Sequence, residues 1–125
     1  MKKVILVFLL VLLLISACSK QNSSPSNQDN ITDGDFKEFK ITAKRFSFEP
    51  SVIEVNKGDK VRLTVESVDV PHGFSILEYG INERLDPGKE VKIEFTADKR
   101  GTFTFFCSVF CGSGHTGMKG KIIVR

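Results

Sequence analysis

The chain has 125 residues, enough for one domain and not for two. Its 41% apolar and 26% charged residues are ordinary for a globular protein, and the formal net charge is +3. Two of the 18 basic residues, Lys2 and Lys3, lie at the extreme N-terminus, so that without residues 1–17 the chain carries 16 basic and 15 acidic side chains. A nearly neutral domain argues against a protein that binds nucleic acid by neutralising phosphates, and we expect no nucleic-acid partner.

Residues 1–17 have the layout of a secretory signal. Two lysines are followed by twelve consecutive apolar residues, Val4–Ile15, and by small residues before Cys18. The apolar run is shorter than the roughly 20 residues of a membrane-spanning helix. The segment Ile15–Cys18 resembles the lipobox of bacterial lipoproteins, whose signal is cut before a cysteine that then carries lipid. The resemblance implies a lipid on Cys18 and an extracytoplasmic protein anchored to a bacterial membrane. A plain signal peptide and a short uncleaved anchor are the alternatives.

Residues 18–35 are predicted to form a lipidated cysteine followed by a flexible tether. From residue 19 to residue 35 the chain has one apolar side chain, Ile31. Such a segment cannot bury enough apolar surface to offset the entropy lost on ordering, so we expect it to be disordered. The tether would hold the folded domain near a membrane without fixing its orientation.

Residues 36–125 are predicted to be an all-β domain. Apolar and polar residues alternate in residues 60–66 and 90–96, the period of a half-buried strand. Turn residues punctuate the chain near residues 56–59, 86–89 and 99–101. No apolar stripe of helical period appears. Further strands are expected at residues 36–41, 51–55, 102–106 and 121–124. Closely spaced short strands predict an antiparallel β-sandwich of Greek-key type. Phe46 and Phe48, two residues apart, are expected to share one strand face in the core.

Metal-binding residue types are concentrated between the last two predicted strands. Cys107, Cys111, His115 and Met118 fall within twelve residues, among several glycines that permit a tight, irregular backbone. Thiolate, imidazole and thioether donors select copper over hard cations. His72 follows Pro71 at the end of a predicted strand. In a sandwich this strand end and the segment 107–118 can meet at the same end of the fold.

Simpler interpretations leave some of these donors without a role. Cys107 and Cys111 could form a disulfide in an exported protein, or a thiol–disulfide exchange pair. Zinc accepts two Cys and two His but has little use for Met118. A mononuclear blue-copper site needs one Cys, two His and a weak axial Met, which leaves the second Cys over. A site with two bridging thiolates uses all five donors and favours a dinuclear copper centre.

The motif C-x3-C-x3-H-x2-M, preceded by D-V-x-H, resembles the dinuclear CuA domain of cytochrome c oxidase subunit II. Nitrous-oxide reductase carries a similar domain. The likeness covers about residues 36–125 and implies a cupredoxin-like fold. It extends to three segments outside the ligands, namely Tyr79–Asn82, Asp86–Gly88 and Gly101–Phe103.

The resemblance implies a ligand set for two copper ions. Cys107 and Cys111 would bridge both ions. His72 and Met118 would complete one copper, and His115 with the backbone carbonyl of Val109 would complete the other.

The implied function is single-electron transfer at the extracytoplasmic membrane surface, without catalysis by the domain itself. A c-type cytochrome would donate electrons, and the catalytic subunit of a cytochrome c oxidase would accept them. Members of the family often receive electrons at an aromatic patch containing Trp. This chain has no Trp, which leaves Phe74 or Phe110 as substitutes. Copper delivery or storage in the cell envelope would use the same ligands and is the alternative function.

Overall fold

The computed structural model describes residues 35–125. In this part of the chain there are nine strands: β1 (Phe36–Lys44), β2 (Ser47–Glu49), β3 (Val52–Val55), β4 (Lys60–Ser67), β5 (His72–Ile76), β6 (Ile81–Leu85), β7 (Glu90–Thr96), β8 (Gly101–Phe106) and β9 (Lys119–Val124). Two short 3₁₀ helices, η2 (Leu77–Tyr79) and η3 (His115–Gly117), interrupt the connections. The predicted signal, the lipidated Cys18 and nearly all of the tether lie outside the described residues and stay predictions.

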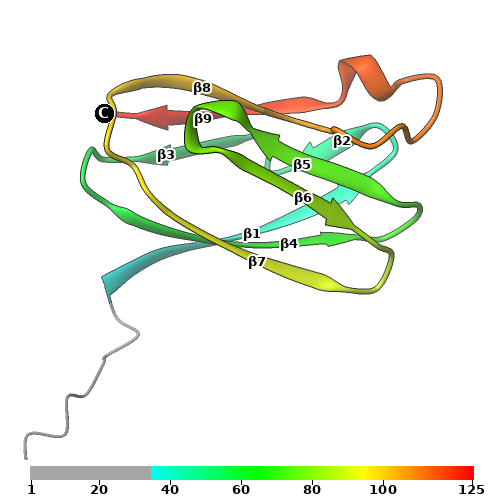
Figure 1. The fold of residues 1–125 in the computed structure, drawn as a ribbon, viewed down its shortest axis with the longest axis horizontal. Coiled ribbons are helices and arrows are strands. Elements are labelled where there is room, and N and C mark those ends of the chain that lie inside the picture. Colours follow the sequence, from blue (N-terminus) through cyan, green and yellow to red (C-terminus); the bar gives the residue numbers. More distant parts are fainter. Residues whose placement is uncertain (1–34) are drawn as a thin grey trace, which may run out of the picture. The chain divides into compact units, whose positions relative to one another are not determined.

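The strands form two sheets that pack as the two layers of a sandwich (Figure 1). One sheet has the order β2-β1-β4-β7 and the other the order β3-β9-β8-β5-β6. The prediction of an all-β, Greek-key sandwich is confirmed. The antiparallel expectation is wrong in two places, because β1 runs parallel to β4 and β3 runs parallel to β9. Alternation of apolar residues reports which face of a strand is buried, and it carries no information about the direction of its neighbour.

Inward-facing side chains of both sheets fill the core. On β4 every second residue, Val61, Leu63 and Val65, is fully buried, as the alternating sequence predicts. Three aromatic rings meet between the sheets, where Phe48 lies edge-on against Phe74 and Phe105 at 5.5 and 5.4 Å between centroids. All three rings are buried in the core between the two sheets.

Two strands, β5 and β6, were not predicted. The strand expected to carry Phe46 and Phe48 is β2, which has only three residues. All five residues of β5 are buried, which hides the alternation that would mark it as a strand. Phe46 precedes β2, so the expectation that it shares a strand face with Phe48 is wrong. Phe48 is buried, whereas Phe46 is 36% exposed.

Candidate metal centre

The expectation that His72 ends a strand is wrong, because it is the first residue of β5; its side chain is fully buried. Its Nε2 lies 2.8 Å from Oδ1 of Asp69, and its Nδ1 lies 3.7 Å from Sγ of Cys107. An ionised carboxylate only accepts hydrogen bonds, so Nε2 carries the proton and Nδ1 presents a lone pair to the sulfur side. The histidine is therefore oriented as a metal ligand, with a carboxylate behind it.

Asp69 stays ionised because its hydrogen bonds outweigh its burial. Burial raises the pKa of this carboxyl group. The backbone N–H of Arg45, the ring of His72 and the backbone N–H of Val70 each lower it, and the resulting pKa is about 2. Asp69 is thus a fixed negative charge that orients the imidazole at any pH near neutrality.

We call residues 107–118, which join β8 to β9, the ligand loop. The loop is orange in Figure 1 and lies at the end of the sandwich where β5 begins. The backbone N–H of Cys107 donates to the carbonyl of Met118 at 3.0 Å, which closes the base of the loop. Cys107, Cys111 and Met118 are 3%, 8% and 1% exposed. A loop closed in this way directs its sulfur atoms inward, toward His72.

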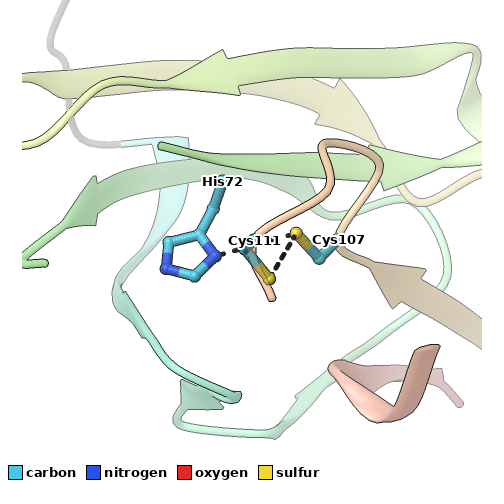
Figure 2. A group of neighbouring side chains, drawn as sticks. All are labelled: His72, Cys107 and Cys111. Carbon is cyan, nitrogen blue, oxygen red and sulfur yellow. Dashed lines mark hydrogen bonds between the residues drawn. The ribbon is translucent and has the colours of Figure 1, made fainter. Parts of the chain in front are cut away.

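The two cysteines are free thiols whose Sγ atoms lie 3.7 Å apart. Figure 2 shows the imidazole of His72 and both thiols directed toward one another. The ligand atoms of these three residues all lie within 4.8 Å of one another. The structure thus brings His72 and the ligand loop together, as the sequence predicts.

The other three candidate ligands also lie beside the sulfur atoms. Sγ of Cys111 is 3.8 Å from Nδ1 of His115 and 3.8 Å from Sδ of Met118. The thiol of Cys107 donates a hydrogen bond to the carbonyl of Val109 at 3.0 Å. Each sulfur therefore has two further donors next to it.

The spacing fits copper held by shared sulfur ligands. Two atoms bonded at about 2.3 Å to the same tetrahedral ion lie about 3.8 Å apart. The separations between sulfur and its neighbouring ring nitrogen or sulfur atoms are 3.7 to 3.8 Å. Soft sulfur and imidazole donors with few oxygen atoms match copper better than magnesium or calcium.

The thiol of Cys111 is protonated near neutral pH without metal. Burial, followed by the hydrogen bond and charge of Cys107, raises the pKa of Cys111 to about 11. A metal ion must therefore displace the proton of Cys111 when it binds to this sulfur.

Sequence reasoning missed Gly73, which brings β5 close to the ligand loop. A Cβ atom there would lie 2.1 Å from Oγ of Ser108 and 2.8 Å from the backbone N of Ser108 and of Val109. Only glycine leaves this space free, and its N–H points to Sγ of Cys107 at 3.4 Å. On the outer side, the hydroxyl of Ser108 donates to Oδ1 of Asn82 at 2.7 Å, which ties the loop to β6.

Of the two aromatic residues expected to substitute for Trp, only one lies at the surface. Phe74 is fully buried and stacks on Phe105, so the expectation that it could receive electrons at the surface is wrong. Phe110 is 78% exposed, and its ring lies 5.7 Å from that of His115. Phe46 is a second exposed ring at this end, where it contacts Gly112 and Gly114 of the ligand loop. Its position in a turn gave no sequence signal.

Within residues 35–125, no helix is long and apolar enough to cross a membrane.

Comparison with known proteins identifies the family of the domain. A family model for cupredoxin-like domains matches residues 5–124. The chain is 33% identical over 85 residues to cytochrome c oxidase subunit 2 of Thermus thermophilus. The aligned residues are 68% of this chain and 63% of the relative. It is 30% identical over 113 residues to nitrous-oxide reductase of Stutzerimonas stutzeri. This alignment covers 86% of the chain but only 18% of that enzyme. The chain thus spans half to two thirds of the Thermus subunits that it matches.

Among solved structures, a chain of a haem-copper terminal oxidase dimer superposes with a TM-score of 0.67 and 26% identity. The match covers 99% of this chain and 94% of the other.

Proposed function

The chain belongs to the cupredoxin-like domain family, and from this premise we propose that it is an electron-transfer domain with a dinuclear copper centre like that of cytochrome c oxidase subunit II. The observation that carries the proposal is the pair of free, buried thiols 3.7 Å apart, with two further donors beside each sulfur. A disulfide exchanger needs the thiols alone and gives no role to His72 or Met118.

The proposed ligand roles follow the neighbours of each sulfur. Cys107 and Cys111 would bridge two copper ions. His72 and Met118, which lie beside different sulfur atoms, would complete one ion. His115 and the carbonyl of Val109 would complete the other, again one beside each sulfur. When bound, such a copper pair supplies a site that gains and loses one electron without breaking bonds.

The surrounding residues favour electron transfer because they restrict movement and exclude water. Cys107 and Met118 are buried and joined through the base of the loop, and Phe105 packs under Gly120 just beyond it. The N–H of Gly73 and the carboxylate of Asp69 hold a sulfur and an imidazole in place. Ligands that move little between two oxidation states keep the barrier to electron transfer low.

The proposed location and partners follow from the relatives and from the N-terminal sequence. An electron-transfer domain of this kind works at the extracytoplasmic membrane surface. A lipid on Cys18 would anchor it there. A c-type cytochrome would donate electrons, with Phe110 and His115 as the exposed contact, and an oxidase catalytic subunit would accept them.

Copper delivery or storage is the second candidate function. A hollow on the outer surface of β8 and β9 is lined by Cys107, His115 and Met118 among others, so copper could be passed through it to a partner. Delivery requires a copper ion that exchanges readily with a partner. Electron transfer requires copper that stays bound to the domain through repeated oxidation and reduction.

Two rates measured on the same copper-loaded protein separate the functions. The first is reduction by a reduced c-type cytochrome in a stopped-flow instrument, and the second is loss of copper to an excess of chelator. We expect reduction that is many times faster than copper loss. Rapid loss of copper with no reduction by the cytochrome would contradict electron transfer and favour delivery.

A further inference from the structure

The turn between β1 and β2 contacts both segments that supply the candidate ligands. This turn consists of Arg45 and Phe46. The backbone N–H of Arg45 donates to Oδ2 of Asp69 at 2.7 Å, and Asp69 in turn holds His72. The next residue, Phe46, contacts the ligand loop at Gly112 and Gly114. One two-residue turn thus touches the carboxylate behind His72 and the backbone between Cys111 and His115.

The ring of Phe46 occupies the space that side chains at two loop positions would need. A Cβ atom on Gly112 would lie 3.0 Å from Cε1 and Cζ of the ring. A Cβ atom on Gly114 would lie 2.4 Å from Cγ and Cδ2 and 2.9 Å from Cβ of Phe46. Real Cβ atoms do not approach carbon so closely, so the ring lies directly against the loop backbone.

Gly114 shows that packing, and not backbone conformation, requires a glycine here. Its φ of −91° and ψ of 5° are accessible to every residue type. Gly117, three residues later, differs, because a Cβ atom there would meet nothing within 4 Å. In the ligand loop, the Phe46 ring therefore excludes a side chain at Gly114 but not at Gly117.

We propose that Phe46 is a positioning residue of the metal centre, whose ring holds the ligand loop in the conformation that places Cys111 and His115 beside each other. Segment 112–114 joins these two candidate ligands and consists of Gly, Ser and Gly, the residues with the least intrinsic restraint. A ring packed on both glycines limits the conformations of the segment. The consequence for copper rests on the proposed function, whereas the restraint on the loop does not.

The first test is a double-mutant cycle between Phe46 and Gly114. Phe46→Ala opens space beside the loop, and Gly114→Ala places a methyl group where the ring lies. Each single change should accelerate copper loss to a chelator by about tenfold, a typical size for coupled packing contacts. In the Phe46→Ala protein the two ring atoms at 2.4 Å are gone and only Cβ at 2.9 Å remains near the added methyl group, so Gly114→Ala should then have a much smaller further effect. Additive effects of the two changes would overturn the proposal.

The control variants keep the test specific to the ring. Gly117→Ala adds the same methyl group to the same loop in open space and should leave copper loss unchanged. Phe46→Tyr retains the ring and should behave as the wild type. Copper loss as fast in Gly117→Ala as in Gly114→Ala would show a general sensitivity of the loop and contradict a role of Phe46.

Hydrogen exchange of the copper-free protein separates this inference from the proposed function. The N–H of His115 donates to Gly112 and the N–H of Gly117 donates to Gly114, each at 3.1 Å, so both amides report on the loop. Phe46→Ala should accelerate their exchange at least several-fold while amides of β4 are unchanged. Unchanged exchange at both amides refutes the inference. Accelerated exchange in a protein that binds no copper refutes the proposed function alone.

Discussion

The metal end of the sandwich and the outer face of the four-stranded sheet use polar residues in opposite ways. On the outer face, Arg62 pairs with Glu38 and Glu94 at 2.7 Å, and Lys40 pairs with Glu66 and Glu90. These pairs join side chains on β1, β4 and β7, and most of the side chains are partly or largely exposed. At the metal end, His72, Cys107 and Met118 are almost completely buried, and the charge of Asp69 is directed at one ring nitrogen.

The difference shows where the fold has specialised. Exposed ion pairs between strands contribute at most about 1 kcal/mol each, and any of several arrangements would serve. Buried sulfur and imidazole groups without a metal lose hydration and gain little, so their presence together calls for a ligand. Changes at the metal end should therefore alter metal binding strongly and stability less, and changes on the outer face should do the reverse on a smaller scale.

The largest effect is expected from Cys111→Ser. Serine cannot replace a bridging thiolate, so the variant should lose the absorption bands of a two-thiolate copper pair and bind fewer copper ions per chain. Absorption spectra and a copper count check this. Val109→Ala is the matched control in the same loop, because only its backbone carbonyl has a proposed role. A coloured Cys111→Ser protein with full copper content would rule out bridging by two cysteines.

Asp69→Asn should have the next largest effect. The amide can still accept the Arg45 hydrogen bond, but it removes the charge that fixes the His72 ring. Loss of such a partner typically lowers metal affinity about 10- to 100-fold. Competition with a chelator of known affinity measures the change. An affinity equal to that of the wild type would show that the ring is held by packing alone.

Met118→Leu should shift the reduction potential and leave copper bound. Leucine preserves the buried volume but removes a thioether that lies 3.8 Å from Sγ of Cys111. A weak ligand of this kind tunes potential more than it contributes to affinity. Protein-film voltammetry of both proteins gives the shift. An unchanged potential would remove Met118 from the proposed ligand set.

The smallest effect is expected on the outer face, from Lys40→Met. Hydrogen bonds with Glu90 and then with Glu66 raise the pKa of Lys40 above its usual 10.5. The raised pKa means that the contribution to stability is complete below pH 10.5 and is lost as the pH rises through the higher value in the folded protein. The wild type should therefore be slightly more stable than the variant near neutral pH, and the difference should shrink above pH 11. Thermal unfolding of both proteins, near neutral pH and at high pH, tests this. A stability difference between them that grows with pH would contradict the pairing of Lys40 with Glu66 and Glu90.

The sequence predicted the proximity of the candidate ligands better than it predicted the strands around them. Cys107, Cys111, His115 and Met118 are close in the chain, so their proximity in space needs only a closed loop. His72 is far away in sequence, and its position followed from the general form of a sandwich. The structure places it 3.7 Å from Cys107.

Features that depend on tertiary contacts could not be predicted from the sequence. β5 is covered on both faces, so its residues do not alternate. The spacing of Phe46 and Phe48 indicated one strand face, but β2 begins at Ser47 and leaves Phe46 in the turn that packs on the ligand loop. The close approach of Gly73 to Ser108 joins residues 35 positions apart, and no local pattern reports it.

The most direct test of the dinuclear centre is the electron paramagnetic resonance spectrum of the copper-loaded protein, recorded with a copper count on the same sample. Two copper ions per chain, with hyperfine splitting from one electron shared equally by both nuclei, is the predicted result. One copper per chain, with splitting from a single nucleus, would contradict it.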